Sequence, residues 1–174
     1  MSEPLAPPPE DRDWTYVITL GCTECGFTPF DPTLAADRLR ATLPRWREAL
    51  ARASVRARPA PMTWSPLEYA CHVRDVNRTM DGRLKLMLAE DGARFDNWDQ
   101  DATAVEDRYW EQDPLVVGDE LAAATEAAVS TLESVPDDAW QRHGFRSNGS
   151  EFTVGTLAVY FVHDVEHHLH DVGA

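Results

Sequence analysis

Four segments of the chain carry apolar side chains at the spacing of amphipathic helices, and this pattern constrains the fold more than any other feature. Each segment has roughly twenty residues or more, enough to bury one face against its neighbours. The segments span residues 32–53, 63–91, 114–135 and 153–172. We therefore predict an all-α fold, a four-helix bundle.

Local signals mark where the second of these helices begins. Ser65 can cap the first turn, Pro66 suits the first helical position, and Glu68 completes a capping box. Inside the first segment, Pro44 has no amide hydrogen to donate, so we expect it to kink or divide that helix.

The remaining residues lie outside these helices. We predict an N-terminal extension over residues 1–31, with an acidic, proline-rich and flexible start, followed by the bundle over residues 32–174. A long polar connection joins the second helix to the third, and its Trp98 and Trp110 argue against disorder. Residues 14–20, WTYVITL, are at best an edge strand.

The net charge of −14, from 30 acidic and 16 basic residues, excludes several classes of partner. Such a surface repels phosphate backbones and anionic lipid, so we expect no nucleic-acid or membrane partner. No apolar run reaches the roughly eighteen residues of a membrane span, and the first residues lack the pattern of a signal peptide. With only three cysteines, we expect a cytoplasmic protein.

Histidines gather near the C-terminus, where the stretch YFVHDVEHHLHDV holds four of the six. Helical residues advance by roughly 100° each, which separates the polar residues of this stretch into two stripes. His163, His167 and His170 fall opposite the apolar stripe, and the pair His163 and His167 is predicted to point mostly to solvent. Asp164, His168 and Asp171 fall on its border, where a site in the interior of a bundle would lie.

The second helix offers a matching donor, because His72 also lies at the border of an apolar stripe. His72, Asp164 and His168 can meet across a bundle. Zn²⁺, Ni²⁺ or Fe²⁺ accepts such a set and keeps positions open for water or substrate. A plainer interpretation stays open: a histidine at a core border is usually a hydrogen-bonded structural residue, and Asp164 can pair with an arginine.

Two motifs carry a family resemblance. WSPLEYACH (64–72) is similar to the W-S-x-x-E-x-x-x-H start of helix two in the DinB/YfiT-like metalloprotein superfamily, and DVEHHLHDV (164–172) resembles the end of its last helix. The likeness covers most of the chain from Pro32 onward. It implies a four-helix bundle that holds one divalent metal.

The resemblance also implies which residues bind the metal. The family's usual ligands are a histidine in helix two and two residues four apart in the last helix, which match His72, Asp164 and His168. Asp171 occupies the place three residues further on, where it would orient a ligand or a bound water. Many members have histidine at position 164, whereas the related maleylpyruvate isomerases that use mycothiol carry a carboxylate there.

Some members of the family resemble thiol transferases that use low-molecular-weight thiols such as mycothiol or bacillithiol. A metal-bound thiol loses its proton and becomes a nucleophile at neutral pH. We therefore expect a metal-dependent enzyme for a small-molecule substrate, with Asp171 in its catalytic machinery and the segment around Trp98 and Asp99 covering the metal. The rival hypothesis is a non-catalytic four-helix interaction module with a solvated, His-rich face. A homodimer stays open.

The extension contains a C-x-x-C motif at Cys22 and Cys25. The motif can be half of a zinc site whose other two ligands the sequence does not identify. It can be a redox dithiol, or two reduced thiols in a turn. The third cysteine, Cys71, is interpreted as a small apolar helix residue.

Overall fold

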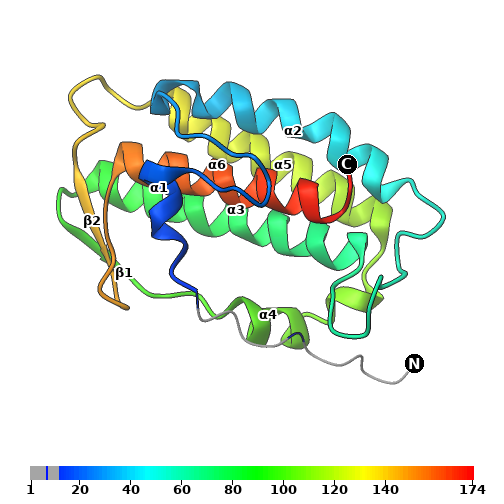
Figure 1. The fold of residues 1–174 in the computed structure, drawn as a ribbon. Helices are drawn as coiled ribbons and strands as arrows, with labels where there is room; N and C mark the ends of the chain where they lie inside the picture. Colours follow the sequence, from blue (N-terminus) through cyan, green and yellow to red (C-terminus); the bar gives the residue numbers. More distant parts are fainter. Residues whose placement is uncertain (1–6, 8–11) are drawn as a thin grey trace.

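Four long helices form a bundle (Figure 1). The computed structural model describes residue 7 and residues 12–174; the flexible start that we expect falls largely on residues outside this range. The four helices are α2 (Ala35–Leu50), α3 (Pro66–Ala89), α5 (Pro114–Glu133) and α6 (Val154–Asp171). Helices α3 and α2 each pack against both α5 and α6. No helix in the described part of the chain is long and apolar enough to cross a membrane.

The start of α3 confirms the predicted capping box. The Glu68 amide donates to Ser65 Oγ at 3.3 Å, and the Ser65 amide donates to Glu68 Oε2 at 2.8 Å. Pro66 occupies the first turn. These contacts satisfy amides that have no partner inside the helix, so the first turn of α3 is fixed next to the bundle core.

The division of the first helix at Pro44 does not occur, since α2 runs unbroken from Ala35 to Leu50. A proline removes only one hydrogen bond from the helix interior. Leu39, Trp46 and Ala49 are buried on both sides of it. Their packing therefore holds the two halves of α2 in one helix against the bundle.

A small sheet lies at one end of the bundle, so the fold is not purely α-helical (Figure 1). Its strands are β1 (Ala93–Phe95), β2 (His143–Arg146) and β3 (Glu151–Thr153). Strand β2 pairs in parallel with β1 and antiparallel with β3. Strands of three or four residues are too short to show the two-residue alternation by which strands are recognised, so the sequence analysis did not predict them.

Residues 14–20, expected at best as an edge strand, are helical. They form a 3-10 turn, η1 (Trp14–Tyr16), and the short helix α1 (Val17–Leu20), which packs on α6. The Asp13 carboxylate caps the turn by accepting from the Thr15 amide at 2.9 Å. Val17 is fully buried, so this segment forms a cover over α6.

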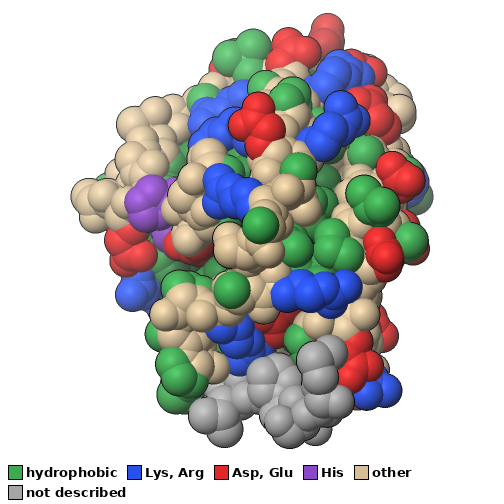
Figure 2. All heavy atoms as spheres, turned by 90° about the vertical axis from the view of Figure 1, so that its right-hand side faces the viewer, with side chains coloured by type: hydrophobic (Ala, Val, Ile, Leu, Met, Phe, Trp, Pro, Cys, Tyr) green, Lys and Arg blue, Asp and Glu red, His purple; other side chains and the backbone are tan. Residues whose placement is uncertain are grey.

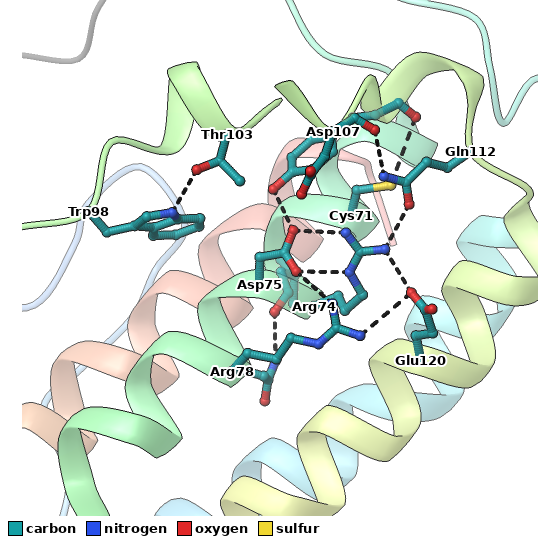
Figure 3. A network of polar contacts seen from close by, with 12 residues as sticks. Cys71, Arg74, Asp75, Arg78, Trp98, Thr103, Asp107, Gln112 and Glu120 are labelled. Carbon is teal, nitrogen blue, oxygen red and sulfur yellow. Dashed lines mark hydrogen bonds and ion pairs between the residues drawn. The ribbon is translucent and has the colours of Figure 1, made fainter. Parts of the chain in front are cut away.

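A polar network ties the long connection after α3 to the bundle (Figure 3). Arg74 donates to both oxygens of Asp75, at 2.9 and 2.8 Å, and the Tyr109 hydroxyl donates to Asp75 Oδ2 at 2.6 Å. Arg74 also donates to Gln112 and to Glu120 of α5. The connection, which includes α4 (Gln100–Glu106) and the turn η3 (Tyr109–Glu111), is thereby ordered.

Charged side chains of both signs are interspersed on the face drawn in Figure 2. Exposed ion pairs also link helices: Arg40 of α2 donates to Glu133 and Glu126 of α5, at 3.0 and 3.4 Å. Exposed pairs of this kind contribute little to stability. The buried network around Asp75 therefore matters more for holding the bundle and its connection together.

We predict that Asp75→Asn lowers the free energy of unfolding by about 3 kcal/mol, because it leaves the buried Arg74 without the carboxylate that accepts two of its hydrogen bonds. Burial raises the pKa of Asp75, but the bonds from Arg74 and Tyr109 outweigh it and hold that pKa below its usual value. The ionised form thus stabilises the fold at neutral pH, and this contribution is lost as the pH falls through the lowered pKa. Urea unfolding followed by circular dichroism measures both effects.

The matched control is Arg108→Gln, which breaks an exposed pair with Glu111. It should cost less than about 1 kcal/mol. Equal losses in the two variants would show that the Asp75 network does not stabilise the fold.

Candidate metal centre

The fold brings His72 of α3 together with Asp164 and His168 of α6. Asp164 Oδ1 lies 3.5 Å from His72 Nε2 and 3.4 Å from His168 Nε2. One donor atom from each residue lies within 4.8 Å of the others. Asp164 and His168 share a helix face because they are four residues apart. Around a tetrahedral metal with bonds of about 2.1 Å, neighbouring donors are roughly 3.4 Å apart, so both short distances fit.

The hydrogen bonding of these donors tests whether they suit a metal. His72 is fully buried, and neither of its ring nitrogens has a hydrogen-bond partner; Asp164 Oδ1 also lacks one. Buried polar atoms without partners cost free energy, and a bound cation removes that cost. The structural interpretation of His72 as a hydrogen-bonded core residue therefore does not fit its surroundings.

The protonation of the donors also suits a metal. Burial lowers the pKa of His72, which favours the neutral imidazole that can ligate. Burial alone would raise the pKa of Asp164, but the close polar contact with His72 and the charge of His168 lower it to about 2. The trio therefore presents an ionised carboxylate and at least one free imidazole lone pair near neutral pH.

Asp171 supports this arrangement from one turn further along α6. Its Oδ2 lies 2.8 Å from His168 Nδ1. When Nδ1 donates this bond, the Nε2 lone pair faces Asp164. A carboxylate behind a ligating histidine fixes its orientation and raises its basicity. Burial lowers the pKa of His168, yet Asp171 and Asp164 outweigh burial and raise it.

Aromatic rings surround His72. The ring of Trp98 stacks on it with centroids 5.5 Å apart and an interplanar angle of 6°, and Trp64 lies 5.3 Å away. The indole of Trp98 is itself held by a 2.8 Å hydrogen bond to Thr103 Oγ1 of α4 (Figure 3). The connection after α3 therefore reaches the donors, in line with the hypothesis that residues near Trp98 and Asp99 cover the site.

A pocket of about 800 Å³ opens beside the three donors. Asp164, His168 and Asp171 line it, and the aromatic rings of Trp14 and Tyr160 form part of its wall. Its volume falls in the range of small-molecule sites. Additional residues come from the N-terminal segment and from the turn between β2 and β3, which the sequence did not connect with the site.

Arg146 is a pocket residue that the sequence analysis missed. Its guanidinium donates to Asn148 Oδ1 at 2.9 Å and to Ser150 Oγ at 3.0 Å, and lies over the ring of Tyr160 at 5.8 Å. No motif pointed to it, because β2 is too short to be recognised in the sequence. It adds a positive charge to the pocket that Asp164 and His168 line.

The prediction that His163 and His167 point mostly to solvent is wrong. Their exposed fractions are 4% and 9%. The ring of Trp14 lies 5.5 Å from His163 and 5.0 Å from His167, and Phe27 packs on His163 at 5.1 Å. The helical period correctly puts these histidines on the far side from the bundle core, but the N-terminal segment then covers that side.

Comparisons with known proteins agree with this architecture. The model of a protein family described as the DinB superfamily matches residues 35–172. Among solved structures, the chain is similar to YfiT from Bacillus subtilis, described as a probable metal-dependent hydrolase with an unusual four-helix bundle topology. The TM-score is 0.67 with 16% identity, over 82% of this chain and 83% of that one. At that identity the likeness shows the fold alone. No curated protein matches the chain.

We predict that His72→Ala binds one divalent ion per chain fewer than the unaltered protein, because it removes the donor that α3 contributes. The measurement is elemental analysis of protein without a His-tag, loaded with Zn²⁺, Ni²⁺ or Fe²⁺ and freed of excess metal. The matched control is His143→Ala, which alters an exposed histidine paired with Glu151 and should leave the metal content unchanged.

Asp171→Asn extends the same experiment. It should keep the metal stoichiometry but weaken affinity by about 10- to 100-fold, because it removes the carboxylate behind His168. Unchanged metal content in His72→Ala, with the fold intact by circular dichroism, would contradict a metal site at these residues.

Proposed function

This chain belongs to the DinB superfamily, and on that premise we propose that it is a metal-dependent thiol S-transferase. In this proposal it activates a low-molecular-weight thiol such as mycothiol for transfer to, or isomerisation of, a small electrophile. One observation carries the proposal: His72, Asp164 and His168 meet beside an 800 Å³ pocket with unpartnered buried donor atoms.

The number and position of the donors support a reactive site over a structural one. Structural zinc sites close with four protein ligands, whereas catalytic sites use three and keep a position for water or substrate. Here three donors meet, and Asp164 and His168 line the pocket. A divalent ion held there would supply Lewis acidity, which lowers the pKa of a thiol or a water bound to it.

The chain's own residues would orient the reactants and move the proton. Asp171 holds His168 by its Nδ1 and acts as a positioning residue. Asp99 and Asp101 line the same pocket, and such carboxylates can take up the proton that a thiol releases. Trp64 and Trp98 keep bulk water from His72, which strengthens the electrostatic interactions inside the site.

Arg146 supports a narrower substrate class. The hydrogen bonds that hold it run to the neutral side chains of Asn148 and Ser150. A planar guanidinium binds a carboxylate through two parallel hydrogen bonds. We infer that the electrophile carries a carboxylate that binds to Arg146, which would direct its reactive carbon into the pocket.

Hydrolysis is the second candidate. YfiT is described as a probable metal-dependent hydrolase, and its fold is similar to that of this chain. The same donors would then activate water instead of a thiol. The non-catalytic interaction module is supported less, because it assumes a solvated histidine face, whereas His163 and His167 are buried.

We predict a metal-dependent conjugation of monochlorobimane with mycothiol, bacillithiol or glutathione, at a rate that falls to background in His72→Ala. The loss is expected because that variant lacks one of three metal donors. Bimane fluorescence measures the rate, and His143→Ala serves as the control with unchanged activity.

Three outcomes separate the candidates. A metal-dependent rate with one of the thiols supports transfer. Cleavage of ester or amide substrates without any thiol, also lost in His72→Ala, would replace transfer by hydrolysis. Neither activity, together with a cobalt spectrum that does not respond to added thiols, would contradict a catalytic role.

We predict that Arg146→Gln raises KM for a carboxylate-bearing electrophile by about 10-fold or more, the effect of losing a charge-assisted hydrogen bond. The KM for an uncharged electrophile should stay the same, since it has no carboxylate to bind. Arg94→Gln on the neighbouring strand β1 is the matched control. Equal effects on charged and uncharged electrophiles would assign Arg146 a structural role.

A further inference from the structure

A second group of four donors meets on the neighbouring face of α6, beside the same pocket. Cys22 and Cys25 come from the N-terminal segment, and His163 and His167 come from α6. One donor atom from each lies within 4.8 Å of all the others. We propose that these residues bind a structural zinc ion, separate from the centre at His72, Asp164 and His168.

The geometry fits zinc with two sulfur and two nitrogen ligands. Cys22 Sγ lies 3.7 Å from His167 Nδ1. With Zn–S of about 2.3 Å and Zn–N of about 2.0–2.1 Å, a tetrahedral ion sets sulfur and nitrogen roughly 3.6 Å apart. The sequence spacings, C-x₂-C and H-x₃-H, also lie in the range of structural zinc sites.

The backbone around the cysteines forms a tight turn, and this turn places both thiols on the same side. The Cys22 amide donates to the Phe27 carbonyl at 2.9 Å, which closes the turn. Gly21 and Gly26 flank it with φ of 74° and 76°, which favour glycine. A Cβ at Gly21 would lie 2.4 Å from the Phe27 oxygen, so a side chain there would force the turn open.

Burial argues for a metal over a redox dithiol. Cys22 and His163 are both buried, and His163 Nε2 has no hydrogen-bond partner. A disulfide between Cys22 and Cys25 would leave that nitrogen unsatisfied and would give the two histidines no role. A zinc ion uses all four groups, and thiolate with imidazole is a ligand set that zinc favours.

The proposed zinc would fix one wall of the pocket. It would link α6 to residues 12–31, and the start of that segment contributes Arg12, Asp13 and Trp14 to the pocket lining. Helix α6 then carries two donor pairs with i,i+4 spacing, offset by one residue: the pair His163 and His167 beside the pair Asp164 and His168. Zinc would thereby set the orientation of α6 without touching a reactant.

Asp171 lies between the two groups. Its Oδ2 is 2.8 Å from His168 Nδ1 and its Oδ1 is 3.8 Å from His167 Nε2. A change in metal binding at one group can therefore affect the other group through the Asp171 carboxylate.

Cobalt spectroscopy tests the site directly. The full-length reduced protein without a His-tag is loaded with Co²⁺, and its near-ultraviolet spectrum is recorded. Of the two groups, only the second contains sulfur, so a thiolate-to-cobalt charge-transfer band reports on it alone. We expect the band in the unaltered protein and in His72→Ala, and its loss in Cys25→Ser and in His163→Asn.

Two matched controls should keep the band. Cys71→Ser alters the remaining cysteine, which is buried in α3, and His170→Ala alters an exposed histidine of α6. Elemental analysis should show two zinc ions per chain in the unaltered protein and one in Cys25→Ser. Limited proteolysis should cut residues 12–31 of Cys25→Ser faster than those of the unaltered protein.

The unaltered protein decides the question even if a variant fails to fold. With both thiols shown to be reduced by thiol titration, absence of the charge-transfer band would overturn the proposal. So would a Cys22–Cys25 disulfide in protein purified without reductant but with zinc present. Loss of metal in His72→Ala with the band retained separates this site from the proposed catalytic centre, so either proposal can fail alone.

Discussion

His72 and Asp164 place ring nitrogens and a carboxylate oxygen inside the protein without hydrogen-bond partners, and a bound cation is the interaction that would satisfy them. Other parts of the molecule are arranged around these atoms. The capping box fixes the first turn of α3 just before His72, and the i,i+4 spacing puts Asp164 and His168 on one face of α6. The two helices pack together, which brings the donors within reach of one ion.

Support for this arrangement comes from three parts of the chain outside the bundle. Arg74 and Asp75 hold the connection after α3, and this connection places the ring of Trp98 in stacking contact with His72. The strands at the end of the bundle place Arg146 in the pocket. The N-terminal segment covers His163 and His167, which turns a helix face that would be solvated into a buried cluster with Cys22 and Cys25.

Prediction from the sequence succeeded where local rules decide the outcome. The bundle, the capping box at Ser65 and Glu68, and the inward border of α6 all follow from spacing within a single helix. It failed on the division of the helix at Pro44, where packing on both sides outweighed one lost hydrogen bond. It also missed the three strands, because three or four residues cannot display an alternating pattern.

The sequence alone determined the helices, their inward faces and the candidate donors His72, Asp164 and His168, because helical periodicity is a property of neighbouring residues. Only the tertiary structure decided the environment of His163 and His167. Residues 145 positions apart meet there, as Cys22 and His167 do. The helical period indicates which side of α6 a residue occupies, but not which segment covers that side. The covering segment depends on how the N-terminal part of the chain folds back onto α6, and this is determined by the apolar area that it buries and by side-chain packing.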